Sequence, residues 1–126
     1  MKKLQDKTAI ITGGSKGIGR SVCLSLSNAG ASVLILDVDE TNGQNLVDEI
    51  LCNGHEASFY KMNVANENEW LTFITFLKEK NIFVDILINN AGIWLGKEIH
   101  DVTLDEYHKL ISINLTGVFL GTKYLT

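Results

Sequence analysis

A glycine-rich segment between an apolar run and an amphipathic stretch restricts the fold more than any other feature. Residues 12–19 read Thr-Gly-Gly-Ser-Lys-Gly-Ile-Gly. Residues 8–12 predict a short buried strand, and the apolar side chains that follow the glycines recur at helical spacing until Gly30 stops the helix. These apolar positions are Ile18, Val22, Cys23, Leu26 and Ala29. A strand, a glycine loop and a helix in this order favour a backbone that approaches a pyrophosphate at the helix N-terminus, although a tight turn without a ligand has the same local pattern.

The same alternation continues along the chain. Strands are predicted at residues 32–37, 58–64 and 84–89, and capping boxes at Asn66 with Glu69 and at Thr103 with Glu106 predict helix starts. The helices between and after these strands carry apolar residues at helical spacing. Those at Trp70, Phe73, Ile74 and Leu77 are expected to form a buried stripe, and the other two sets are Leu46, Val47, Ile50 and Leu51, and Tyr107, Leu110, Ile111 and Leu115. Nearly continuous apolar strands separated by helices predict an α/β fold with a doubly wound parallel sheet of about four strands, in a single domain over residues 1–126.

The carboxyl ends of the predicted strands carry the candidate binding residues, because ligands of such sheets bind at that rim. Asp37 closes the second strand about 20 residues beyond the glycine loop, where a carboxylate accepts hydrogen bonds from both ribose hydroxyls of an adenosine. An N-cap role for Asp37 is the alternative, and both roles are compatible. The carboxylate would repel a 2′-phosphate by ~1 to 4 kcal/mol, whereas an exposed Lys16 would attract it by only ~0 to 1 kcal/mol. The pattern therefore predicts NAD in preference to NADP.

Composition excludes several function classes. The 126 residues carry a net charge of −4 with scattered basic residues, so nucleic acid is not an expected partner. The longest apolar runs are too short to span a membrane, and the first residues lack the apolar stretch of a signal peptide. We expect Cys23 and Cys52 to be reduced small hydrophobes and the compartment to be cytoplasmic. The three histidines do not cluster at ligand spacing, so no metal site is predicted.

Three motifs together resemble the short-chain dehydrogenase/reductase family: Thr-Gly-x-x-x-Gly-x-Gly from Thr12, Asn89-Asn90-Ala91-Gly92, and Asn114-Leu115-Thr116-Gly117. The resemblance implies the N-terminal half of a Rossmann-like fold and a hydride transfer between NAD and an alcohol or ketone carbon. Residues 117–122 are similar to secondary-alcohol and hydroxysteroid dehydrogenases of that family.

The resemblance also implies roles for individual residues. The glycine loop would bind the cofactor pyrophosphate; the residues concerned are Gly13, Ser15, Lys16, Gly17, Ile18 and Gly19. Asp37 would hold the adenosine ribose, while Asn63 and Val64 would lie beside the adenine, with asparagine where the family usually has aspartate. Asn90, Ala91 and Gly92 would line the cofactor's ribose and brace the sheet. Asn114 would hold, through its main chain, a water that links the active site to solvent.

The family's catalytic serine and Tyr-x-x-x-Lys pair have no counterpart in this sequence. Tyr60, Tyr107 and Tyr124 have no lysine four positions later. We therefore interpret the chain as a domain truncated before the catalytic segment. The alternative is a catalytically inactive NAD-binding fragment. For the substrate, the alternative to an alcohol dehydrogenase is a 3-oxoacyl-carrier-protein reductase. A nucleotide-triphosphatase loop at residues 14–21 fits worse, because Arg20 replaces its lysine.

Expected partners follow from the same reasoning. The substrate would be a small alcohol or ketone. The fourth strand would lie at an open sheet edge, and the last helix would expose Leu115, Val118 and Phe119. Such apolar surfaces associate unless they are covered, so the full-length protein is expected to be a homo-oligomer.

Overall fold

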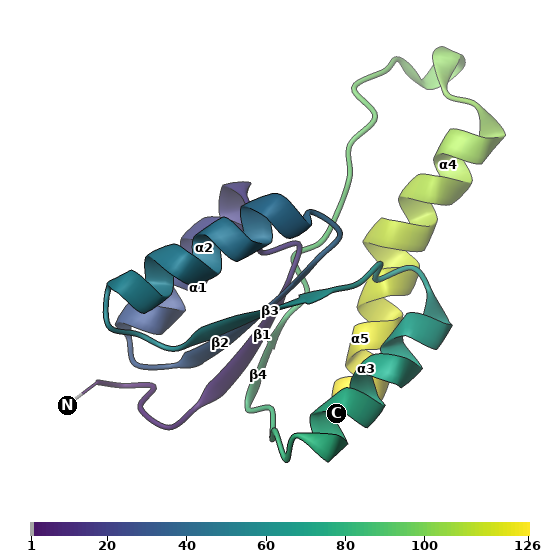
Figure 1. Ribbon diagram of the computed structural model, residues 1–126. Coiled ribbons are helices and arrows are strands. Elements are labelled where there is room, and N and C mark those ends of the chain that lie inside the picture. Colours follow the sequence, from purple (N-terminus) through teal and green to yellow (C-terminus); the bar gives the residue numbers. More distant parts are fainter. Residues whose placement is uncertain (1) are drawn as a thin grey trace.

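Four parallel strands and the helices between them make up the chain in the computed structural model, which describes residues 2–126 (Figure 1). The elements are β1 (Thr8–Thr12), α1 (Gly17–Asn28), β2 (Ser32–Asp37), α2 (Glu40–Cys52), β3 (Ala57–Lys61), α3 (Glu67–Glu79), β4 (Ile86–Ile88), a 3₁₀ turn η1 (Ile99–Asp101), α4 (Leu104–Ile111), a π turn η2 (Ser112–Thr116) and α5 (Gly117–Leu125). The strand order is β3-β2-β1-β4. The predicted Rossmann-like parallel sheet is confirmed.

The register of the strands brings their carboxyl ends to one rim. Ile11 of β1 pairs with Ile35 of β2 on one side and with Ile88 of β4 on the other. Asp37, the last residue of β2, pairs with Lys61, the last residue of β3. The loops that leave all four strands therefore begin close together at the same edge of the sheet.

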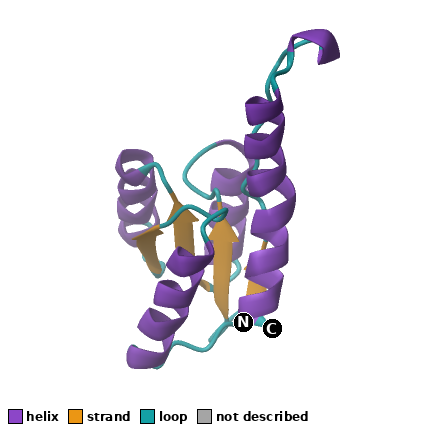
Figure 2. Cartoon of the chain, turned by 90° about the vertical axis from the view of Figure 1, so that its right-hand side faces the viewer, coloured by secondary structure: helices purple, strands orange, loops and turns teal. Residues whose placement is uncertain are grey.

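Alternating side chains of the strands supply two separate cores. Ala9, Ile11, Val33 and Ile35 pack with α1 and α2 on one face, whereas Ile10, Leu34 and Leu36 pack with α3 and α5 on the other. Figure 1 shows this three-layer arrangement, and Figure 2 shows α4 and η1 extending beyond the sheet. No residue of α4 is buried: Tyr107 is exposed, and Leu110 and Ile111 are half-buried. That helix projects past the strands that would cover it.

Local signals place the helix ends. The predicted capping box is present at Thr103 and Glu106, and Gly30 follows α1 with a φ of 103°, a conformation that favours glycine. At Asn66 only half of the predicted box forms: its side chain accepts a hydrogen bond from the Glu69 N–H, but the Glu69 carboxylate accepts from the Asn63 N–H instead.

Two strands are shorter than predicted. β3 ends at Lys61, since the Asn63 side chain accepts a hydrogen bond from the Ala65 N–H and turns the chain. β4 covers only Ile86–Ile88, because the Asn90 N–H turns back to the Ile88 carbonyl. These turns begin the loops that form the rim.

Some apolar residues at helical spacing are exposed. Ile18 is 78% exposed because it lies in the first turn of α1, at the rim. Leu115 is 62% exposed, as expected for the last helix. Leu51 (47%) and the free Cys52 lie on the outer side of α2. Cys52 is therefore not a core hydrophobe, whereas Cys23 is fully buried.

Candidate nucleotide-binding site

A pocket of about 450 Å³ opens at the carboxyl ends of the strands. The loops after β1, β2, β3 and β4 all contribute to it, together with one residue of the π turn. Its lining residues are Gly13, Lys16, Ile18, Leu36, Asp37, Val38, Asp39, Met62, Asn63, Val64, Asn90, Ala91, Gly92, Ile93 and Ile113. The four parallel strands therefore converge on one cavity, as the general rule for open α/β sheets predicts.

The glycines of the first loop serve two different purposes. Gly13 has a φ of 62°, and a Cβ there would lie 2.7 Å from the Ala91 Cα. A Cβ on Gly19 would overlap the Gly13 carbonyl and lie 2.5 Å from the Asn90 side-chain nitrogen. Gly17 has a φ of 60°, but no described atom lies within 4 Å of its Cβ position. Gly13 and Gly19 thus allow close packing, and Gly17 borders open space.

The N-terminus of α1 is polar and open. Lys16 is its N-cap residue and makes no side-chain cap hydrogen bond, and the first turn contains no acidic side chain. The first N–H groups of a helix have no partner within the helix, and together with the helix dipole they attract anions. This end of α1 has the chemistry of a phosphate site.

Thr12 and Asn90 fasten the loop after β4 to the glycine loop. The Asn90 side-chain amide donates to the carbonyls of Thr12 (3.1 Å) and Gly13 (3.0 Å). The N–H groups of Asn90 and Ala91 both donate to the Thr12 hydroxyl, each at 3.0 Å. Six polar groups are satisfied in this way, so the two loops hold one geometry.

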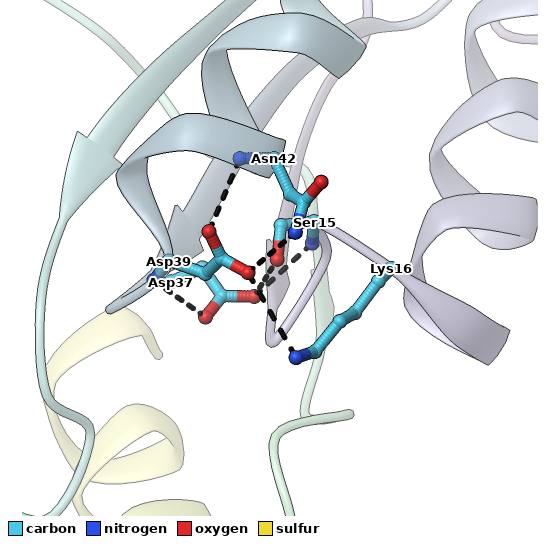
Figure 3. Close-up of polar contacts among 5 residues, drawn as sticks. All are labelled: Ser15, Lys16, Asp37, Asp39 and Asn42. Atoms are coloured by element: carbon cyan, nitrogen blue, oxygen red, sulfur yellow. Dashed lines mark hydrogen bonds and ion pairs between the residues drawn. The ribbon is translucent and has the colours of Figure 1, made fainter.

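The Asp37 carboxylate is oriented by Ser15 (Figure 3). One carboxylate oxygen accepts from the Ser15 hydroxyl at 2.5 Å and from the Ser15 N–H at 3.1 Å, and the other accepts from the Asp39 N–H at 3.1 Å. Ser15 is only 2% exposed, which fixes its position beneath the carboxylate. The N-cap of α2 is Asp39, so the alternative N-cap role for Asp37 is wrong.

Asp39 lies beside Asp37 and carries a charged partner. Its carboxylate accepts from the Asn42 N–H at 3.1 Å and from the Asn42 side-chain amide at 2.7 Å. The Lys16 ammonium lies 3.8 Å away. The hydrogen bonds from Asn42, and then the charge of Lys16, lower the pKa of the Asp39 carboxyl. The carboxylate is thus held in its charged form at the pocket edge.

Asn114 lies in the π turn and reaches the loop after β4. Its side-chain oxygen accepts from the Ile93 N–H at 2.7 Å, and its side-chain nitrogen donates to the Ile93 carbonyl at 2.9 Å. The family resemblance implies a role for the main chain of Asn114, and the structure adds these two side-chain hydrogen bonds. π turns within α-helices occur often at functional sites.

Most of the predicted binding residues meet at this pocket. Gly13, Lys16, Ile18, Asp37, Asn63, Val64, Asn90, Ala91 and Gly92 line it. Ser15, Gly17, Gly19 and Asn114 do not: Ser15 and Gly19 lie behind the loop, Gly17 lines a shallow neighbouring hollow, and Asn114 acts on the pocket through Ile93.

Sequence reasoning missed six lining residues: Leu36, Val38, Asp39, Met62, Ile93 and Ile113. Only Asp39 offered a signal, as the second carboxylate of an Asp-x-Asp pair at a strand end. The others are apolar residues next to recognised motifs.

Within residues 2–126, no group of three or more His, Cys, Asp or Glu side chains is arranged to hold a metal ion. None of the helices in the described part of the chain combines the length and apolar character required to cross a membrane.

Known proteins are similar to this chain in sequence. Cyclopentanol dehydrogenase of Comamonas testosteroni is 36% identical over 123 residues, which cover 98% of this chain and 49% of that protein. A 3-oxoacyl-[acyl-carrier-protein] reductase of Synechocystis is 37% identical over 124 residues, covering 98% of this chain and 50% of the reductase. The chain thus spans about half the length of these relatives.

A solved structure gives the same result in three dimensions. The crystal structure of a proposed gluconate dehydrogenase from Agrobacterium tumefaciens superposes with a TM-score of 0.93 at 34% identity, covering 97% of this chain and 48% of that one. Residues 7–126 match the profile of the short chain dehydrogenase family. The resemblance predicted from three motifs is confirmed, and this chain belongs to the short-chain dehydrogenase family of oxidoreductases.

Proposed function

We propose that this chain is the cofactor-binding half of an NAD-dependent oxidoreductase that moves a hydride between nicotinamide and an alcohol or ketone carbon. The observation that carries the proposal is the pocket at the strand ends, which both the open N-terminus of α1 and the oriented Asp37 carboxylate border. The first suits a pyrophosphate and the second suits a ribose diol.

The residues present fit a dinucleotide. Gly17 leaves open space beside the helix N-terminus, which a side chain would fill and a phosphate can enter. Asn63 and Val64 would border the adenine, and Asn90, Ala91 and Gly92 would border the nicotinamide-side ribose. Bound there, the nicotinamide supplies or accepts the hydride. The protein's own contribution is to bind and orient the dinucleotide through Asp37 and the loop N–H groups.

The charge of the pocket edge supports NAD over NADP. Asp37 has its carboxylate fixed by Ser15 at the position where a ribose would lie, so it cannot turn away from a 2′-phosphate without losing these bonds. A phosphate placed at contact distance from this carboxylate is repelled by ~1 to 4 kcal/mol. A ribose diol instead donates two hydrogen bonds to it.

The catalytic serine and the Tyr-x-x-x-Lys pair of the family would lie outside this sequence, in a longer protein. The half-length match to the relatives supports this reading. An inactive NAD-binding product of 126 residues is the second candidate. For the substrate, similarity to cyclopentanol dehydrogenase favours a secondary alcohol, and similarity to the 3-oxoacyl reductase keeps an acyl-carrier-protein substrate as the alternative.

Exposed apolar residues support an oligomer of the full-length protein. Leu115 and Phe119 are 62% and 59% exposed on the helix pair η2 and α5, while Val118 is half-buried. β4 lies at the edge of the sheet with one side unpaired. Free thiols at Cys23 and Cys52 are consistent with the proposed cytoplasmic location.

The experiment is a pair of measurements. The intact mass of the protein from its native source, with an assay of NAD-dependent alcohol oxidation, separates a longer enzyme from a 13.9 kDa product. Titration of the 126-residue chain with NAD and NADP tests the cofactor. Binding of neither dinucleotide would refute the proposed function, and tighter binding of NADP would refute the NAD assignment.

A further inference from the structure

Lys16 is the one cationic side chain among the described residues that line the pocket. Lys16 is therefore the side chain of this lining that could attract the 2′-phosphate of NADP. Its side chain is 74% exposed, and a lysine stem has several rotatable bonds, so its ammonium can reach different partners around the rim. What Lys16 contacts in the protein decides whether it is free to bind a phosphate.

The partner of Lys16 is Asp39, and Asp39 is fixed. As the N-cap of α2 it receives both the N–H and the side-chain amide of Asn42, at 3.1 and 2.7 Å. Figure 3 shows the Lys16 side chain reaching from the glycine loop to the edge where Asp37 and Asp39 lie side by side. The carboxylate is anchored by its helix, so the mobile lysine is the partner that is held.

The charged side chains at this edge have a net negative charge, which repels a phosphate. Asp37 and Asp39 contribute two negative charges within the lining of the pocket, and Lys16 contributes one positive charge. An incoming phosphate would meet a net negative edge. It would also have to compete with Asp39 for Lys16, the one lysine among the described residues of the lining.

We infer that Asp39 is a second determinant of cofactor choice, which keeps Lys16 from the 2′-phosphate of NADP and adds its own charge against that phosphate. The inference rests on the proposed function, since it concerns the same dinucleotide site. Asp37 selects for the ribose diol by direct contact, whereas Asp39 holds the Lys16 ammonium in an ion pair. The lowered pKa of Asp39 means that this effect persists well below neutral pH.

The test is Asp39→Asn, which removes the charge and keeps a good N-cap, because asparagine caps helices about as well as aspartate. The ratio of NADP to NAD affinity, measured by calorimetric titration at low salt, should rise about three- to tenfold. The matched control is Glu40→Gln. Glu40 is the next acidic residue on α2, pairs with Lys61 at 3.7 Å and does not line the pocket, so its loss should leave the ratio unchanged.

Lys16→Met supplies the decisive comparison. In the wild-type chain it should change the ratio of NADP to NAD affinity by less than about twofold, because Asp39 already holds the lysine. In the Asp39→Asn chain it should remove several-fold of the gained ratio. A contact of Lys16 with the pyrophosphate is common to both dinucleotides and cancels in this ratio. An unchanged ratio in Asp39→Asn, or an equal effect of Lys16→Met in both chains, would overturn the inference while leaving NAD binding intact. Failure of the wild-type chain to bind either dinucleotide would instead refute the proposed function and the inference together.

Discussion

Two glycines of the first loop, Gly13 and Gly17, share a backbone conformation and differ in surroundings, which makes them a matched pair. Their φ angles are 62° and 60°. A Cβ on Gly13 would lie 2.7 Å from the Ala91 Cα, but a Cβ on Gly17 would meet no described atom within 4 Å. Substitution by alanine at both positions therefore separates backbone strain from steric overlap.

The expected losses of stability differ only by the steric overlap. An L-residue in the left-handed region destabilises the fold by roughly 1–2 kcal/mol, and this loss applies to both variants. Gly13→Ala must in addition displace the backbone at Ala91, and overpacking of this kind costs about 1–3 kcal/mol. With a urea m-value of about 2 kcal/mol/M for a domain of this size, Gly13→Ala should unfold about 0.5–1.5 M earlier than Gly17→Ala.

Dinucleotide binding should show a different ranking. Gly17→Ala places its methyl group in the open space beside the N-terminus of α1, where the pyrophosphate is proposed to bind. This variant should lose NAD affinity by more than its smaller loss of stability accounts for. Urea unfolding followed by circular dichroism, and calorimetric titration with NAD, measure the two effects. Coincident unfolding midpoints for the two variants would refute the packing argument, and unchanged NAD affinity in Gly17→Ala would refute the placement of the phosphate.

Three further outcomes are expected. Ser15→Ala removes a hydrogen bond to the Asp37 carboxylate, so urea unfolding should show a loss of ~1.5–3 kcal/mol, and titration should show weaker NAD binding. Burial raises the pKa of the Cys23 thiol from 9.0 to about 12; because the folded state then holds a proton that the unfolded state loses, the free energy of unfolding should fall as pH rises from about 9 to 12, and this slope should flatten in Cys23→Ala. Asn114→Ala removes both bonds to Ile93, so hydrogen exchange at the Ile93 amide should accelerate while exchange in β1 stays unchanged.

Features that depend on neighbouring residues in the chain could be predicted from the sequence. The bounds of β1 and β2 match the predicted ranges, since each of these central strands has an unbroken apolar interior between polar end residues. The capping box at Thr103 needs only the two side chains of one turn. The place of the binding rim could also be predicted, because a parallel sheet brings the carboxyl ends of its strands together whatever the details of the loops.

Features that depend on tertiary contacts could not be predicted in this way. The helical spacing of Ile18 and Leu51 fits a buried stripe, but the first residue lies at the rim and the second on the outer side of α2, where no layer covers it. The π turn at Asn114 has no periodic signal, because it shifts the helix by a single residue. Asp39 pairs with a lysine 23 positions earlier in the chain, so its contact exists only after β1 and β2 have paired.

The glycine motif combines two functions that only the geometry separates. Gly13 and Gly19 pack against the loop after β4, which Asn90 fastens with bonds to the Thr12 and Gly13 carbonyls, so their absence of a side chain serves the fold. Gly17 has a left-handed φ of 60°, which favours glycine, and it also faces open space that a ligand can enter. A motif match alone therefore shows that the rim is built in the family's way. The proposed binding rests in addition on the pocket at the strand ends and on the space beside Gly17.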